Sequence, residues 1–416
     1  ETNSSDIKLT STSKNKIVLP GLLEFNNFII NLPSSSYTDK SRLESYFSQI
    51  NYDFKDTYYL SASIRRDGSS RFVKNKWDTF GSIGGAWIIS NESFIENSNF
   101  IKFLKLKASY GIIGEQAGVG YYPGLTLSNI NNSNDEISIT EDFVGNPDLT
   151  WEKSKMYQVG LESQLSNFLD INLDYYIKDT ENLLFDKRLN IGSGVAIQDV
   201  NDGTLRNSGL EFDINAKIIN KEDFKLGVSL NGEFLKNKLT AMPIDVSTGE
   251  QKVIDIDGVF GRTKGRSLYD FYTREWAGVD PANGAPMWYA YYYDANNDGV
   301  FNESDDSEVI NSLHEYQAEF PDRTLTKTVT SNSAVATRQF LNKSSIPTVR
   351  GGFRLNMSYK NFDFSSQLIY SLGGYAYDAA YADMMGNGRV GSWNWHKNIR
   401  NRWQNPADIT NVPALT

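Results

Sequence analysis

One stretch of the chain has the residue types and the spacing of a calcium-binding loop. It reads DANNDGVFNESD over residues 294–305, with oxygen-bearing side chains at positions 1, 3, 5, 9 and 12 and glycine at position 6. Calcium prefers about 6–8 hard oxygen ligands, and this EF-hand-like spacing lets one short loop surround one ion. The expected ligands are Asp294, Asn296, Asp298, the carbonyl oxygen of Val300, Asn302 and Asp305.

The twelfth position of this loop weakens the prediction. Asp305 stands where the EF-hand pattern has glutamate, and its shorter side chain makes bidentate coordination harder. The alternative is a solvated turn rich in Asn and Asp that holds no ion. If calcium binds, we expect it to stiffen an extracellular loop, and we expect no catalytic role for it.

A basic cluster is the second group that could contact a ligand. The segment RRDGSSR at 65–71 contains Asp-Gly-Ser-Ser, which predicts a loop tip where glycine supplies a positive φ. Three arginines flank this tip: Arg65, Arg66 and Arg71. They could contact a substrate, or they could pair with neighbouring carboxylates at the tip of a hairpin.

Two tryptophans form the third group. Trp393 and Trp395 lie two residues apart in SWNWHKN, and their rings could stack on a sugar. The alternative is that they form the buried core of a loop. A further tryptophan, Trp151 in NPDLTWE, is expected near a membrane interface, where we interpret it as a packing anchor.

Composition excludes several classes of chemistry. The chain has no cysteine, which rules out disulfides, thiolate catalysis and Cys-based zinc sites. Its only histidines, His314 and His396, are too few for a His-rich metal site. No phosphate-binding glycine loop, Ser-His-Asp spacing or HExxH motif is present; a glycosidase carboxylate pair is not excluded by counting, yet none stands out. The net charge of −10 without a basic stripe argues against nucleic acid as a partner, and we expect no enzyme.

The elements that must position these residues are amphipathic β-strands. In LDINLDYYI at 169–177 the apolar residues occupy one parity and the polar residues the other, which is the period of a strand. The same alternation occurs at 58–67, 210–218, 224–234 and 353–360. Tight turns with Asn, Asp and Lys join many of these segments in pairs. Long polar segments near 115–148, 186–207 and 241–346 separate the pairs.

Alternation alone does not decide whether the apolar face packs in a protein core or contacts lipid. In a soluble β-sandwich or propeller this face would be the core, whereas in a membrane barrel it would meet lipid. Runs of nine or more residues match the ~9–11 needed to cross a bilayer and exceed the ~5–6 of a usual soluble strand. Aromatic residues also gather near the strand ends. The pattern therefore favours the barrel without excluding the sandwich.

An ordered set of segments resembles the barrel of the SusC/RagA family, TonB-dependent outer-membrane transporters of Bacteroidetes. These segments are RRDGSSRF (65–72), WDTFGSIGGAWIISNESF (77–94), FLKLKASYGIIGEQ (103–116), NPDLTWEKSKMYQVGLES (146–163), LDINLDYYIKDTENLL (169–184), RNSGLEFDI (206–214), GRSLYDFYTREWAGVDPANGAPMWY (265–289) and PTVRGGFRLNMSYKNFDFSSQLIYSLGGYAYD (347–378). The resemblance covers nearly the whole chain from about residue 43 onward.

The resemblance implies an all-β fold. Residues 1–416 would be part of an antiparallel transmembrane barrel of about 22 strands, with short periplasmic turns and long extracellular loops. We estimate roughly twelve to sixteen strands in this part from spans of ~10 residues. Nothing in it resembles the family's N-terminal signal, plug domain or TonB-contacting box, so we expect those parts elsewhere in the protein.

The resemblance also implies a function. The family takes up oligosaccharides, or peptides in some members, through a barrel whose plug TonB remodels, and a SusD-like surface lipoprotein closes the barrel mouth as a lid. Outer-membrane lipid, TonB and this lipoprotein are thus the expected partners, and the long loops would bind the cargo together with the lid. The rival interpretations are a soluble or surface-anchored β-rich glycan-binding protein and a β-rich hydrolase.

Overall fold

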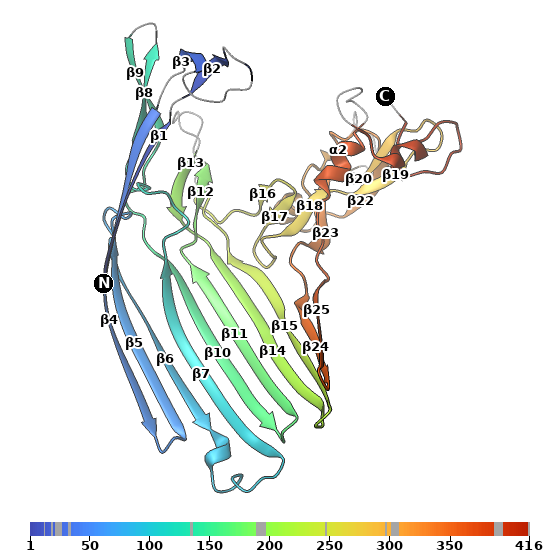
Figure 1. The fold of residues 1–416 in the computed structure, drawn as a ribbon. Helices are drawn as coiled ribbons and strands as arrows, with labels where there is room; N and C mark the ends of the chain where they lie inside the picture. The colour runs from blue at the N-terminus through green and yellow to red at the C-terminus, as the bar shows by residue number, and fades with distance from the viewer. Residues whose placement is uncertain are drawn as a thin grey trace. The chain divides into compact units, whose positions relative to one another are not determined.

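The computed structural model of the chain consists mainly of antiparallel strands (Figure 1). It describes residues 1–11, 13–17, 20, 27–31, 35–133, 136–188, 197–245, 248–295, 298–300, 308–386 and 394–414. These residues form two compact units, the first with Glu1–Leu161 and Lys178–Asp202 and the second with Glu162–Ile177 and Gly203–Thr416. The predicted all-β fold class is confirmed.

The largest sheet has eleven strands, in the hydrogen-bonded order β1-β4-β5-β6-β7-β10-β11-β14-β15-β24-β25. Their bounds are β1 (Thr2–Ser11), β4 (Ser35–Phe54), β5 (Tyr58–Ser69), β6 (Trp77–Ile88), β7 (Ile101–Glu115), β10 (Glu152–Leu165), β11 (Leu169–Glu181), β14 (Thr204–Asn220), β15 (Phe224–Ala241), β24 (Val349–Tyr359) and β25 (Phe362–Leu372). The estimate of twelve to sixteen barrel strands was too high for the described residues, because most of the segment between β15 and β24 folds into separate small sheets.

Tight turns join these strands in pairs at one end. Lys55 and Asp56 have positive φ angles between β4 and β5, as do Ser166 between β10 and β11 and Lys360 between β24 and β25. Residues in this left-handed region reverse a strand within two or three positions. The predicted hairpins are therefore present, and most connections at the other strand ends are longer.

The longer connections carry secondary structure of their own. The first unit contains three two-stranded sheets and a 3-10 turn: β2 (Lys14–Ile17) with β3 (Phe28–Asn31), β8 (Leu127–Ser133) with β9 (Glu136–Phe143), β12 (Leu184–Arg188) with β13 (Ile197–Asn201), and η2 (Ile89–Asn91). The second unit contains β16 (Asp255–Asp257), β17 (Phe260–Arg262), β18 (Asp270–Arg274) and β23 (Arg338–Ser344) in one sheet, and β19 (Trp276–Val279), β20 (Pro286–Tyr293), β21 (Glu308–Val309) and β22 (Leu325–Thr330) in another.

Helices are few and short in the described residues. They are α1 (Leu313–Glu319), α2 (Ala379–Met384) and the 3-10 turn η4 (Lys397–Asn401). None of the helices in this part of the chain is long and apolar enough to cross a membrane.

A small core of three aromatic residues and one leucine lies beside strand β6 in the first unit. Phe72, Phe80, Leu149 and Trp151 are between 0% and 7% exposed and pack on one another. The Trp151 ring centroid lies 5.2 Å from that of Phe72 and 5.5 Å from that of Phe80. Trp151 is thus a packing anchor, as its sequence context indicated.

The predicted loop tip at 67–70 is wrong. Strand β5 continues through Ser69, and Gly68 does not have a positive φ. The reason for glycine is instead a close approach, because a Cβ atom at Gly68 would lie 2.6 Å from the indole of Trp77 on the paired strand. The chain reverses after this point, between β5 and β6.

Candidate functional site

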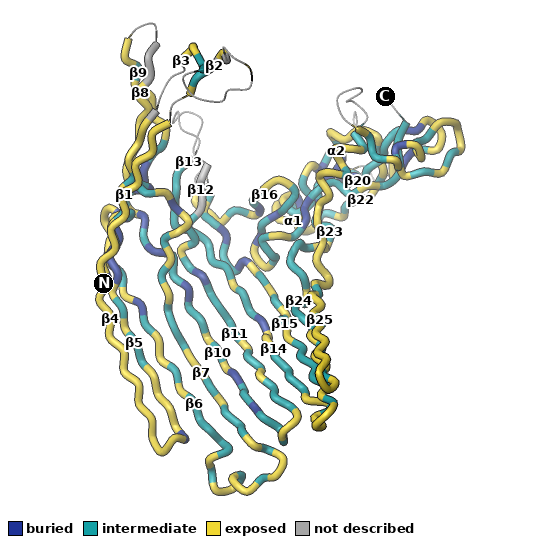
Figure 2. The backbone as a smooth tube through the Cα atoms, viewed as in Figure 1, coloured by how far each residue is buried: buried dark blue, intermediate teal, exposed yellow. Residues whose placement is uncertain are grey.

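The apolar face of the large sheet is uncovered in each unit. Leu60, Ile64 and Ile83 in the first unit are 49–58% exposed, and Tyr175 and Ile218 in the second are 51% and 56% exposed. Figure 2 shows the strands as mostly exposed or intermediate along their lengths. None of the apolar residues in the five alternating segments is buried. A β-sandwich would bury this face against a second sheet. An apolar face that is left uncovered is instead suited to contact with membrane lipid.

The opposite face is polar, and in the first unit its side chains bond across strands. The hydroxyl oxygens of Ser63 and Ser82 lie 2.7 Å apart. Arg65 donates from Nε to both carboxylate oxygens of Asp67, at 2.6 and 2.8 Å, and from Nη2 to Ser45 Oγ at 2.9 Å. Asp67 is 8% exposed, so the guanidinium neutralises a nearly buried carboxylate. Ser63, Ser82, Arg65 and Asp67 line a hollow of about 610 Å³.

In the second unit the polar face is acidic. A hollow of about 420 Å³ on β11, β14, β15 and β24 is lined by Asp174, Glu211, Asp213, Glu233 and Arg350. Arg350 pairs with Glu233 at 2.5 Å, so the lining has four carboxylates and one guanidinium. This part of the wall therefore favours cationic groups in the space it faces.

The structure does not bring the three predicted arginines together. Arg65 lies on the polar face, and Arg66, the next residue in β5, points to the opposite face, where its guanidinium lies 5.8 Å from the Trp77 ring centroid. Arg71 lies beyond the strand and donates from Nη1 to the carbonyl oxygens of Gln116 and Val119, at 3.2 and 2.8 Å. Of the two interpretations, pairing with a carboxylate describes Arg65, and a substrate contact by any of the three stays a prediction.

The two predicted tryptophans are only partly covered by the structure. Trp393 lies outside the described residues. Trp395 is half-buried, and its indole Nε1 is buried without a hydrogen-bond acceptor in the described part of the chain. A sugar contact by either ring therefore stays a prediction.

The candidate calcium loop is also described in part. Asn296, Asn302 and Asp305 lie outside the described residues. The Oδ2 atom of Asp294 accepts the backbone N–H of Gly299 at 2.9 Å, and Asp298 Oδ1 accepts that of Val300 at 2.7 Å. The other oxygen of Asp294, Oδ1, is buried and has no hydrogen-bond donor among the described residues, which leave out 296–297 and 301–307. A buried carboxylate oxygen with no donor suits a metal ligand.

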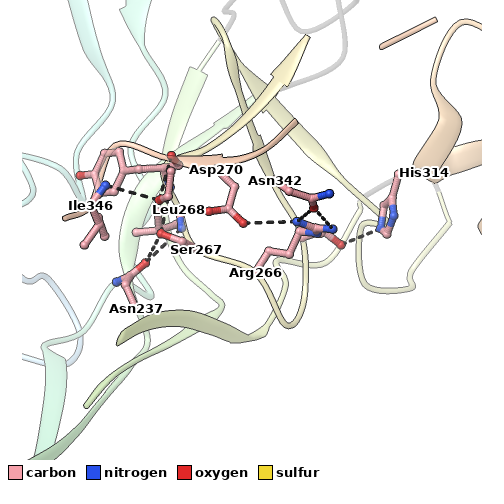
Figure 3. A network of polar contacts seen from close by, with 11 residues as sticks. Asn237, Arg266, Ser267, Leu268, Asp270, His314, Asn342 and Ile346 are labelled. Carbon is pink, nitrogen blue, oxygen red and sulfur yellow. Dashed lines mark hydrogen bonds and ion pairs between the residues drawn. The ribbon is translucent and has the colours of Figure 1, made fainter. Parts of the chain in front are cut away.

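A polar network that we did not predict from the sequence lies where β15 ends, in the second unit (Figure 3). The Asn237 Oδ1 atom accepts hydrogen bonds from Ser267 Oγ at 3.0 Å and from the backbone N–H of Leu268 at 3.1 Å. Its Nδ2 atom donates to Asn207 on β14 at 2.6 Å. Asn237 thereby fixes the turn before β18 to the large sheet, and residues so far apart along the chain give no local sequence signal.

His314, at the start of α1, belongs to the same region. The Thr263 hydroxyl donates to the carbonyl oxygen of Val253 at 2.7 Å, so it must accept from His314 Nε2, 2.9 Å away. The hydrogen bonds therefore place the imidazole proton on Nε2. Burial lowers the pKa of His314, and the positive charge of Arg266 lowers it further.

The comparison with protein families agrees with this two-faced sheet. The sequence model of the family described as "TonB dependent receptor-like, beta-barrel" matches residues 15–250, more than half of the chain. The chain belongs to the TonB-dependent receptor β-barrel family. Membership places the sheet in the bacterial outer membrane, with the apolar face toward lipid and the polar face toward the lumen.

Curated relatives narrow the type of TonB-dependent receptor. The chain is 30% identical over 399 residues to TonB-dependent receptor P3 of Formosa agariphila, an alignment that covers 92% of this chain and 37% of the relative. It is 28% identical to TonB-dependent receptor SusC of Bacteroides thetaiotaomicron, with 82% of this chain and 32% of the relative covered. The chain thus spans about a third of the length of these relatives, and it is of the predicted SusC/RagA type.

Solved TonB-dependent receptors share the fold. The structure of the RagAB peptide transporter matches with a TM-score of 0.77 at 25% identity, over 100% of this chain and 43% of that one. The RagAB peptide importer in the open-open state matches with a TM-score of 0.78, also at 25% identity, over 100% of this chain and 42% of that one. These relatives and structures are receptors and transporters, and none of them is named as an enzyme.

Proposed function

We propose that the chain forms part of the barrel of an outer-membrane importer of the SusC type, energised by TonB. The observation that carries the proposal is the sheet with two unlike faces, one uncovered and apolar and the other lined with paired charges and hydroxyls. Such a wall suits a barrel that holds a polar path across lipid. The similarity of the chain to SusC and to the RagAB peptide transporter supports this proposal.

The cargo in this proposal is an oligosaccharide or a peptide. A SusD-like surface lipoprotein would act as a lid, and the long connections near 115–148, 186–207 and 241–346 would contact the cargo together with it. TonB would act on a plug elsewhere in the protein. Support for a peptide comes from the similarity to the RagAB peptide transporter, and support for a glycan comes from the resemblance to the SusC type.

Calcium in the 294–305 loop is a second part of the proposal. Asp294, with one oxygen bound to the turn and the other without a donor, is the residue that supports it. In the test, calcium should raise the Tm of the intact protein and EGTA should lower it, and Asp294→Asn should remove the shift. An unchanged Tm with and without calcium would contradict this part alone.

The importer proposal is tested by cargo uptake. Deletion of the gene should abolish growth on one class of oligosaccharide or peptide as the sole carbon source, and deletion of tonB should have the same effect. The matched measurement is solubility, because an intact barrel needs detergent or lipid. A protein that stays monomeric at high concentration without detergent would refute the importer, and glycan cleavage by the purified protein would support the hydrolase instead.

A further inference from the structure

A polar hollow of about 490 Å³ lies at the end of β15 in the second unit. Its lining includes Lys236 and Asn237 from β15 and Arg266, Ser267 and Asp270 from the segment that leads into β18. The network of Figure 3 forms one side of it, where Asn237 holds the 265–268 turn in place. None of the predicted site residues lies in this hollow.

Arg266 is held in one orientation by an aromatic ring. Its guanidinium carbon lies 4.0 Å from the ring centroid of Phe340. Phe340 is fixed in turn by Tyr272 and His314, whose ring centroids lie 4.6 and 5.5 Å away. On β17, Gly261 leaves room for this ring, since a Cβ there would lie 3.1 Å from Phe340. A guanidinium stacked in this way is preorganised, so it loses little freedom on binding.

Among the described residues, the donors of this guanidinium have only long hydrogen bonds. Both terminal nitrogens lie 3.4 Å from Asn342 Oδ1, and Nη1 lies 3.5 Å from Asp270 Oδ2. Charge-assisted hydrogen bonds are usually about 2.7–2.9 Å long, so all three contacts are weak. The side chain is 36% exposed, which leaves its N–H groups open to a ligand.

The hollow carries less negative charge than the hollow on β11, β14, β15 and β24. The charged residues of its lining are Arg266, Asp270 and Lys236, and Lys236 has the strand parity of Phe234, on the opposite face of β15 from Asn237. On the side of Asn237, Arg266 therefore stands against one carboxylate, whereas four carboxylates stand against Arg350 in the other hollow. A carboxylate fits a planar guanidinium with two parallel N–H donors, which matches the open fork of Arg266.

We propose that this hollow binds a carboxylate group of the cargo, with Arg266 as its bidentate donor. The inference rests on the proposed importer function and narrows its cargo to molecules that carry a carboxylate. Acidic oligosaccharides and peptides share this chemistry. Neutral glycans lack it.

The test is a binding measurement by isothermal titration calorimetry on the intact protein in detergent. The probes are trigalacturonate, the neutral trisaccharide galactotriose, trialanine, and trialanine with an amidated C-terminus. At least one carboxylate probe should bind about tenfold or more tightly than its neutral partner, because only the carboxylate can form charged hydrogen bonds with Arg266. The probe that binds identifies the source, a glycan or a peptide.

Three variants assign the binding to Arg266. Arg266→Gln should reduce affinity for the carboxylate probe by about tenfold or more, and Arg266→Lys should have a smaller effect because it keeps the charge without the fork. Lys264→Gln is the matched control. Lys264 is exposed and lies outside the hollow, and its substitution removes one positive charge two residues away from Arg266. It should leave affinity unchanged.

A second measurement covers the case in which Arg266→Gln does not fold. A carboxylate bound to Arg266 reduces the positive field at His314, so saturation with the probe should raise the pKa of His314 in the unsubstituted protein. The readout is NMR of the intact protein with labelled histidine, and the imidazole signal that disappears in His314→Gln is that of His314.

Three outcomes would overturn the proposal: equal binding of charged and neutral probes, equal losses in Arg266→Gln and Lys264→Gln, and a His314 pKa that the bound probe leaves unchanged. TonB-dependent uptake of a neutral cargo would then leave the importer function standing. If the unmodified strain showed no TonB-dependent uptake of any cargo, charged or neutral, the importer function itself would be contradicted. The two failures can therefore be told apart.

Discussion

An arginine placed on the apolar face of the sheet should destabilise the barrel far more than one placed on the adjacent polar position. Ile83 is the test residue, because it is 53% exposed on β6 and lies between Trp77 and Trp87, the aromatic residues near the two ends of that strand. This position puts it near the middle of the bilayer. Ser82 is the matched control, since neighbouring residues of a strand point to opposite faces.

The magnitudes follow from the two environments. Arg at the bilayer midplane costs about 2–4 kcal/mol in a transmembrane barrel, so Ile83→Arg should lower the free energy of unfolding by that amount. Ser82→Arg moves the charge into the lumen and loses the hydrogen bond to Ser63, which contributes about 0.5–1.5 kcal/mol. The assay is urea-dependent unfolding of the intact protein in lipid vesicles, followed by tryptophan fluorescence.

A labelling experiment tests the same orientation without a stability change. Residues 1–416 contain no cysteine, so Ile83→Cys and Ser82→Cys each introduce one labelling site in this part of the protein, and the unsubstituted protein gives the background labelling. Brominated acyl chains should quench the label at residue 83 strongly and the label at residue 82 weakly. An Ile83→Arg cost below about 0.5 kcal/mol, the range of an ordinary surface substitution, together with equal quenching at both positions, would refute the assignment of this face to lipid.

Three further predictions concern single side chains. Trp151→Ala should cost about 3–5 kcal/mol in unfolding free energy, because the ring is 3% exposed; a cost below 1 kcal/mol would show that the aromatic core is not packed as described. Gly68→Ala should cost about 1–3 kcal/mol through the clash with Trp77, and the double variant with Trp77→Ala should cost less than the sum of the two single changes; strict additivity would rule out that contact. The pKa of folded His314 is lowered from its usual 6.5, so the unfolded state binds the proton first and stability should fall as the pH drops below about 6.5. Hydrogen exchange around His314 measures this, and a slope that persists in His314→Gln would assign the effect to another group.

The sequence predicted the two-faced strands because that information is local. Alternating side chains in 169–177 show the period directly, and turn residues such as Lys55 and Asp56 show where the chain reverses. Alternation also separates Arg65 from Arg66, since two consecutive strand residues point to opposite faces. The sequence pattern of 67–70 predicted a loop tip, and that prediction grouped these two arginines in one cluster.

The predictions that were wrong or incomplete depend on contacts between distant residues. The sequence around Gly68 is typical of a turn, but the structure shows that glycine is needed there because the indole of Trp77, nine positions away, leaves no room for a Cβ atom. The hollow at Arg266 is assembled from β15, the turn before β18 and residues between 344 and 348, and Phe340 on β23 stacks on Arg266, so no window of sequence contains it. The strand estimate divided the chain into spans of ~10 residues, whereas many strands of the large sheet are longer, up to the 20 residues of β4, so fewer strands fit.

The outer strand β25 has a consequence for the biogenesis of the protein. Within the described residues it pairs with β24 alone, and Leu368 and Ile369 are 62% and 84% exposed on it. An unpaired edge in hydrocarbon leaves backbone N–H and C=O groups without partners, at several kcal/mol each, while in water such an apolar edge recruits other chains. Residues 1–416 expressed alone should therefore self-associate in the periplasm. They should insert into the outer membrane only together with a strand that pairs with the free edge of β25.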